Sequence, residues 1–175
     1  MLANPLKSIP IQKTPPCLRV LVESDLDQLK EVYRDAVITQ AKALYSSAQI
    51  GAWSNHAHRS HFLAKALIRG YGLASCNPTD AAVVEAFGLL DPIERLSLLY
   101  CRGRSCRQGR SGAILVGLEK HAWQQGCRQW HTEASQLSKP LLLRMGWQID
   151  HEERVIFAGE AFLRWRMIKS LNQPI

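Results

Sequence analysis

Residues 96–122 read LSLLYCRGRSCRQGRSGAILVGLEKHA, which places a buried strand, a basic loop and an amphipathic helix in direct succession. The loop contains Gly103 and Gly109, and the helix begins with Arg-Ser-Gly-Ala at residues 110–113. Four arginines surround the point where the first helical amides emerge: Arg102, Arg104, Arg107 and Arg110. Because those amides and the helix dipole favour anions, the segment predicts a site for a diphosphate. A solvated basic loop is the alternative, since glycine-rich turns before helices are common.

The sequence on either side of this segment predicts one α/β domain with a mixed sheet over residues 17–175. Ser24 and Asp27 have the spacing of a capping box, and apolar residues then recur at three and four positions through Leu44, which predicts a helix of about five turns. Further helices are predicted over 49–53, after a serine cap at Ser46 and Ser47, and over 61–68, 110–125 and 140–145. Strands are predicted over 17–23, 71–76, 81–90, 95–101, 127–133, 147–156 and 160–168.

Residues 1–16 hold four of the eight prolines and no acidic residue, so we expect a flexible N-terminal arm. The 175-residue chain is 46% apolar and 21% charged, which excludes a disordered, collagenous or coiled-coil protein. Its formal charge of +7 favours an anionic partner such as a phosphate-bearing cofactor, nucleic acid or an acidic surface. The five scattered cysteines indicate reduced thiols, and no apolar run approaches the roughly 20 residues that span a bilayer. We therefore expect a cytoplasmic protein without a membrane partner.

The central segment resembles the GNAT superfamily of acyl-CoA-dependent N-acetyltransferases. The family motif, Q/R-x-x-G-x-G/A after a strand ending in a Leu-Tyr-Val-like triplet, falls on residues 106–111 behind Leu99-Tyr100-Cys101. Residues 132–135 and 139–147 are similar to the family's fifth strand, short helix and R-x-G-F end. Residues 45–53, YSSAQIGAW, resemble the YS-x-EQ-xx-AW segment of one bacterial subgroup. These segments follow the family's order and cover about residues 18–169.

The resemblance implies the GNAT fold, a central mixed and largely antiparallel twisted sheet flanked by helices and splayed at the acyl-CoA site. It implies acetyl-CoA as co-substrate and an acyltransferase that moves the acetyl group to a primary amine by direct attack. The diphosphate would lie on the backbone amides of residues 107–113 and the pantetheine arm along residues 99–101. The cofactor-binding positions are then Leu99, Tyr100, Cys101, Arg107, Gln108, Gly109, Arg110, Ser111, Gly112, Ala113 and Ser135.

Four positions depart from the family pattern. Cys106 stands where the family usually has Gln or Arg, and Ser111 where it has Gly. Leu142 lies where many members carry the tyrosine that protonates the leaving thiolate, and Ser97 replaces an acidic residue of the central strand. These departures support a second hypothesis, a catalytically silent GNAT-fold protein that senses a CoA ligand or binds nucleic acid or protein through its basic surface. The intact register and the arginine-rich loop favour the enzyme.

Three carboxylates are candidates for the base that removes the ammonium proton. Glu133 shares one face of the fifth strand with Ser135, near the expected splay of the sheet, and a rim carboxylate paired with an arginine is the alternative. Glu85 lies within the strand before the central one, and Glu94 lies just ahead of the central strand. A structural ion pair is the alternative for both, because an acid in mid-strand needs a partner or water.

The histidines and cysteines do not predict a metal site. His56, His58 and His61 have an H-x-H-xx-H spacing, but their polar surroundings favour solvent-exposed side chains. A second group, Cys101, Cys106, Cys127 and His131, matches no compact zinc module.

Aromatic residues give two further interpretations. Tyr45 and Trp53 either line the acceptor pocket as a wall for a cation or pack the segment onto the core. Trp165 either alternates between core and surface on a strand or stacks on a nucleic-acid base. We expect residues 45–72 to form the acceptor pocket, and because this segment has a weak pattern, the sequence does not identify the acceptor amine. The oligomeric state is also open, and a homodimer is one possibility.

Overall fold

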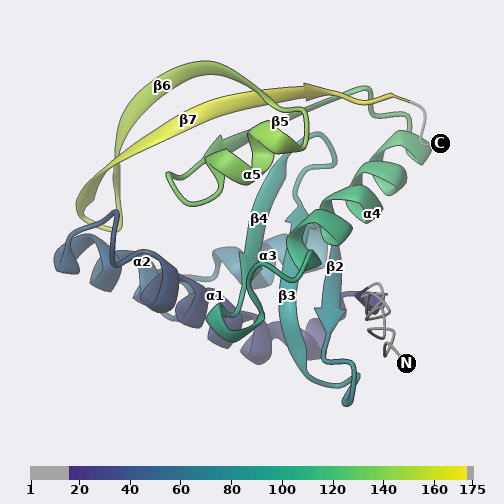
Figure 1. The fold of residues 1–175 in the computed structure, drawn as a ribbon, viewed down its shortest axis with the longest axis horizontal. Coiled ribbons are helices and arrows are strands. Elements are labelled where there is room, and N and C mark those ends of the chain that lie inside the picture. The colour runs from purple at the N-terminus through teal and green to yellow at the C-terminus, as the bar shows by residue number, and fades with distance from the viewer. Residues whose placement is uncertain (1–15, 173–175) are drawn as a thin grey trace, which may run out of the picture.

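Two antiparallel sheets form the framework of the protein in the computed structural model, which describes residues 16–172 (Figure 1). The first sheet has the order β1-β2-β3-β4, with β1 at Leu18–Val20, β2 at Tyr71–Cys76, β3 at Val84–Leu90 and β4 at Leu96–Cys101. The second has the order β5-β7-β6, with β5 at Gln129–Ala134, β6 at Gln148–Phe157 and β7 at Glu160–Ser170. The predicted α/β class with a largely antiparallel sheet is confirmed.

Helices cover both faces of the first sheet. The helices are α1 (Leu26–Gln40), α2 (Ser47–Arg59), α3 (Phe62–Arg69), α4 (Arg110–Gln124) and α5 (Lys139–Arg144), with single 3-10 turns at Glu23–Asp25 and Gly103–Ser105. Side chains of α1, α2 and α3 share one core with Phe87 and Leu89 of β3, whereas α4 packs with Ala86 and Leu90 in a second core. Strand β3 is therefore buried along its whole length, which explains why its sequence is apolar except for Glu85.

Within residues 16–172, backbone bridges join the two sheets only where β4 and β5 begin. Arg95 and His131 form one parallel bridge, the His131 amide donates to the Glu94 carbonyl at 2.9 Å, and the Thr132 hydroxyl donates to the Leu96 carbonyl at 2.7 Å. Trp130, 1% exposed, fixes the same corner by donating its indole N–H to the Ile93 carbonyl at 3.1 Å. No further bridge joins the two strands in residues 16–172. The sheet is thus splayed beyond Leu96, as the family resemblance implies (Figure 1).

Two local predictions about the N-terminal helices are wrong. Helix α1 ends at Gln40 rather than near Leu44, and Ser24 is exposed. Asp25 takes the capping role, because its carboxylate accepts the Val22 amide at 2.9 Å and two bonds from Arg19 at 2.7 Å. Helix α2 continues to Arg59, well past the short turn expected from the sequence.

Glycines follow three of the helices. Gly70 ends α3, while Gly126 and Gly146 follow α4 and α5 with φ of 85° and 83°, a conformation that glycine adopts without strain. The predicted arm at 1–16 lies, apart from residue 16, outside the described residues. Within residues 16–172, none of the helices combines the length and the apolar character that crossing a bilayer requires.

Candidate active site

A cavity of about 960 Å³ lies between the diverging ends of β4 and β5. Its walls are β4, the loop and first turn that start α4, and the side chains of Leu141, Leu142 and Arg144 from α5. We call it the splay cavity. Of the predicted cofactor positions, Leu99, Tyr100, Cys101, Arg107, Gly109, Arg110, Ser111, Gly112 and Ser135 line it. Gln108 and Ala113 do not line it, and the Gln108 side chain donates instead to the Arg104 carbonyl at 3.1 Å.

Six consecutive backbone N–H groups are free at the start of α4. From Arg107 to Gly112 none donates to a protein acceptor within residues 16–172, and the first engaged amide is that of Ala113, which donates to the Gly109 carbonyl at 3.0 Å. Arg107 and Gly109 have φ of 59° and 81°. Left-handed residues interleaved with right-handed ones turn successive amides toward a common point, which is the geometry of an anion-binding nest. A Cβ built on Gly112 meets no atom within 4 Å, so open space lies beside these amides.

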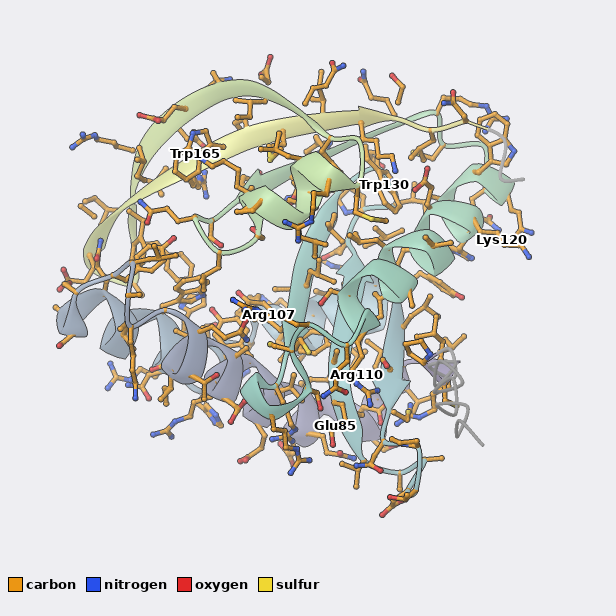
Figure 2. The ribbon with its side chains drawn as sticks, viewed as in Figure 1. Glu85, Arg107, Arg110, Lys120, Trp130 and Trp165 are labelled. Atoms are coloured by element: carbon orange, nitrogen blue, oxygen red, sulfur yellow. The ribbon has the colours of Figure 1, made fainter. Side chains whose placement is uncertain are left out.

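Positive charge without a partner surrounds the same turn. Arg110 is 8% exposed, and one of its terminal nitrogens donates to the Ser75 hydroxyl and the Cys76 carbonyl, both at 2.8 Å. Its buried Nε has no acceptor, and within residues 16–172 no carboxylate pairs with Arg107, Arg110 or Arg144. Figure 2 shows Arg107 and Arg110 at the loop that leads into α4. Helix dipole and guanidinium groups together favour an anion at this place.

Strand β4 presents a free backbone edge to the splay cavity. The Arg102 amide donates to the Glu85 carbonyl at 2.8 Å, which fixes the residues that face β3. Because neighbouring residues of a strand direct their backbone groups to opposite edges, those of Leu99 and Cys101 point away from β3. The Gln40 side chain donates to the Cys101 carbonyl at 2.7 Å on this side. Backbone groups of an extended, amide-bearing chain would find partners along this edge.

Glu85 binds residues of the loop between β4 and α4 but does not line the splay cavity. Its carboxylate, 1% exposed, accepts bonds from Arg104 at 2.6 and 3.0 Å, from the Ser105 hydroxyl at 2.7 Å and from Asn77 at 3.1 Å. Burial by itself raises the pKa of Glu85, but these hydrogen bonds outweigh it and lower the pKa to about 2. Glu94 is exposed and lines neither of the two cavities described here. Neither residue is therefore placed to act as the base, and for Glu85 the structural ion pair is the correct interpretation.

Replacing Glu85 with glutamine should lower the free energy of unfolding by about 3 kcal/mol at pH 7, because the carboxylate pKa falls from 4.5 to about 2 on folding. A lowered pKa stabilises the folded state above pH 4.5, and this stabilisation is lost as the pH falls toward 2. Urea unfolding at pH 7 and pH 3 should show the difference between the two proteins shrinking to less than half. The exposed Glu31→Gln should change little. An equal loss at both pH values would contradict a charge effect.

A second cavity, of about 600 Å³, lies on the other side of β4 toward α2 and α3. We call it the aromatic cavity, after its lining by Tyr33, Tyr45, Trp53, Phe62, Tyr100, Phe157 and Phe162. The two cavities share six lining residues: Trp53, Ser97, Leu98, Tyr100, Glu133 and Ser135. They therefore meet at the point where β4 and β5 part, and a ligand in one can reach a ligand in the other there.

Glu133 is the carboxylate at this junction. Its Oε2 accepts from Arg95 at 2.8 and 3.1 Å, and its Oε1 accepts from Arg166 at 2.6 Å. A carboxylate offers about four acceptor positions, so one on Oε1 remains for a water molecule or an amine. The pairing with an arginine, which the sequence offered as the alternative to a base, is present, and Glu133 lines both cavities where β4 and β5 part.

Hydroxyl groups accompany Glu133 at the junction. Ser135 Oγ lies 3.2 Å from Ser138 Oγ, and Ser97 donates to the Asp91 carbonyl at 2.6 Å. Burial raises the pKa of Tyr100 to about 12, so its hydroxyl stays protonated, while it accepts the Trp53 indole N–H at 3.2 Å. Leu142, 1% exposed, presents only an apolar side chain to the splay cavity.

Tyr45 and Trp53 pack with the core, and both also line the aromatic cavity. Their rings lie 5.3 Å apart, edge to face, and line the aromatic cavity, while Trp53 is also a buried member of the core. The Tyr45 hydroxyl accepts the Gln136 amide at 2.9 Å and so links the segment before α2 to the chain after β5. Sequence reasoning missed Tyr33, Phe157 and Phe162, since each has the spacing of an ordinary core residue. Trp165 is 7% exposed beneath the Lys139 ammonium, 3.4 Å from its ring centre, and is not available for stacking on a base.

Of the three clustered histidines, His58 and His61 are exposed, as expected, whereas His56 belongs to the aromatic packing. His56 lies with its ring centre 4.8 Å from that of Phe62 and 4.4 Å from that of Phe157, and burial lowers its pKa. Within the part of the chain that the structure describes, no group of three or more His, Cys, Asp and Glu is placed to hold a metal ion.

Solved structures share this architecture over nearly the whole chain. A GCN5-related N-acetyltransferase from Rhodopseudomonas palustris matches with a TM-score of 0.85 and 20% identity, covering 92% of this chain and 99% of that one. The PaiA N-acetyltransferase from Thermoplasma acidophilum, in complex with coenzyme A, matches at 0.71 and 17%, over 88% and 99%. A phosphinothricin acetyltransferase from Sinorhizobium meliloti, in complex with acetyl-CoA, matches at 0.62 and 16%, over 90% and 89%. No model of a known protein family and no curated protein matches the sequence. The chain thus has the GNAT fold.

Proposed function

We propose that the protein transfers an acetyl group from acetyl-CoA to a primary amine. The observation that carries this proposal is the row of six free amides from Arg107 to Gly112, which faces a cavity and is flanked by unpaired arginines. Such a nest suits the diphosphate of a coenzyme. The coenzyme A and acetyl-CoA complexes of proteins with the same fold support it.

The residues of the splay cavity fit such a donor. The amides of residues 107–112 would hold the diphosphate, with Arg107, Arg110 and Arg144 supplying charge, and Ser111 adds a small hydroxyl beside it. The free edge at Leu99 and Cys101 would bind the amide groups of the pantetheine arm. The thioester would then lie where the two cavities meet, at Ser97, Glu133 and Ser135.

The reaction requires that the acceptor's ammonium group lose a proton before the attack and that the departing thiolate gain one. The amine nitrogen attacks the thioester carbonyl carbon, a C–N bond forms, and the C–S bond breaks with the electron pair on sulfur. Glu133 would accept the ammonium proton through water at its one remaining acceptor position. The nitrogen loses a second proton as the C–N bond forms, and the Ser135 and Ser138 hydroxyls, 3.2 Å apart beside the splay cavity, would relay a proton to the thiolate in place of the missing tyrosine.

Titration calorimetry with acetyl-CoA tests the donor. We expect a dissociation constant in the micromolar range, about −8 kcal/mol, and thiol release when a suitable amine is added. Absence of binding to folded protein would remove the proposed function.

A catalytically silent CoA-binding protein is the second candidate. The observation that favours it is Leu142, an apolar side chain where many relatives carry the tyrosine that serves the thiolate. Acetyl-CoA binding without thiol release across a broad amine panel would select this candidate over the enzyme.

A further inference from the structure

We propose that the acceptor is a small amine that also carries an anionic group on an apolar or aromatic body, as an apolar α-amino acid does. The proposal rests on the acetyl transfer proposed above and concerns the aromatic cavity, where the amine would bind.

The charged lining of the aromatic cavity is predominantly positive. Lys65, Arg69, Arg95 and Arg164 line it, against the carboxylates Asp91 and Glu133. Both carboxylates are already engaged, Asp91 by Arg69 at 2.7 Å and Glu133 by Arg95 and Arg166. Lys65 is exposed on α3 and pairs with no carboxylate among residues 16–172. The cavity therefore offers a cation without a partner and almost no free carboxylate.

This charge balance decides which amines fit. A polyamine would bring two or more positive charges to a positive cavity and find a single acceptor position on Glu133. An amine with a carboxylate brings a charge that Lys65 can pair with. The lining thus favours an acceptor that carries an anionic group.

The aromatic lining of the cavity favours an acceptor with an apolar body. The rings of Trp53 and Phe162 lie 6.0 Å apart and those of Phe157 and Phe162 5.9 Å apart, both edge to face, so they form one continuous wall with Tyr45. A volume of about 600 Å³ is in the range of small-molecule sites and too small for a folded partner. A hydrophilic acceptor would leave this wall without contacts.

Matched pairs of amines test the proposal. Thiol release from acetyl-CoA is measured with L-phenylalanine, L-tryptophan and L-leucine, and with their decarboxylated counterparts phenethylamine, tryptamine and isoamylamine, with spermidine as the polyamine. We expect kcat/KM for the best amino acid to exceed that of its counterpart by about tenfold or more, since the amino acid gains a charged contact that its counterpart lacks. Preference for spermidine or for the decarboxylated amines overturns the proposal. If no amine of this panel causes thiol release while calorimetry still shows acetyl-CoA binding, the proposal about the acceptor is also overturned. The proposed acetyl-CoA site is not affected by that result.

A pair of lysine variants locates the anionic group. Lys65→Gln should reduce the ratio of kcat/KM between an amino acid and its counterpart about tenfold. Lys120→Gln removes the same charge from an exposed position on α4 (labelled in Figure 2) that lines neither cavity, and should leave the ratio unchanged. Because Lys65 is exposed and unpaired, its variant should fold, which the melting temperature verifies. An unchanged ratio in folded Lys65→Gln would contradict the role given to Lys65.

Discussion

Replacing Gly112 with glutamate should weaken acetyl-CoA binding on the order of 100-fold or more. The Gly112 amide belongs to the free row at the start of α4, and a Cβ there meets no protein atom within 4 Å, so the new side chain enters the nest without disturbing the fold. A carboxylate beside a diphosphate costs several kcal/mol, and each 1.4 kcal/mol is tenfold in affinity. Folding should not suffer, because glutamate is a better helix former than glycine and a negative charge suits a helix N-terminus.

Gly51→Glu is the matched control for this variant. Gly51 also lies in a helix, α2, with no atom within 4 Å of its Cβ position, and it lines neither cavity. Calorimetry should give an unchanged acetyl-CoA affinity for Gly51→Glu and a large loss for Gly112→Glu. Gly112→Ala should fall between them, because its methyl group occupies the space without adding charge. Equal affinities of the two glutamate variants would place the diphosphate elsewhere.

The elements around the nest could be predicted from sequence because their signals are local. A buried strand, two glycines and an amphipathic helix lie within residues 96–122, and Gly109 is left-handed where the turn requires it. The extent of α2 could not be predicted in the same way. Residues 54–61 are mostly polar, and only contact of Trp53 and Ala57 with the core, four residues apart, shows that the helix continues.

The partners of the candidate carboxylates are set by tertiary structure. Glu85 and Arg104 are 19 residues apart, and Glu133 and Arg166 are 33 apart on neighbouring strands. The arginine-rich loop offers four possible partners for Glu85, and no spacing rule selects one. The aromatic cavity has the same origin, because α1, α2, β6 and β7 each contribute residues whose spacing is that of ordinary core positions.

Glu133→Gln should lower kcat on the order of 100-fold while leaving the dissociation constant for acetyl-CoA nearly unchanged, the magnitude typical of a lost general base. Glutamine keeps the shape of the side chain and can accept through one oxygen only. It therefore retains part of the contact with Arg95 or Arg166 but has no basic site for the ammonium proton.

Because Glu133 also fixes two arginines, the control must disturb that network without touching the junction. Glu153 meets this need: its Oε1 accepts from Arg164 at 2.6 Å and from Arg166 at 2.8 Å, yet it lines neither cavity. Loss of kcat in Glu133→Gln alone would assign the proton transfer to Glu133. Equal losses of kcat in Glu133→Gln and Glu153→Gln would show that the Glu133 carboxylate acts by holding Arg166 in place. The base would then be a water molecule bound to the Ser97 and Ser135 hydroxyls.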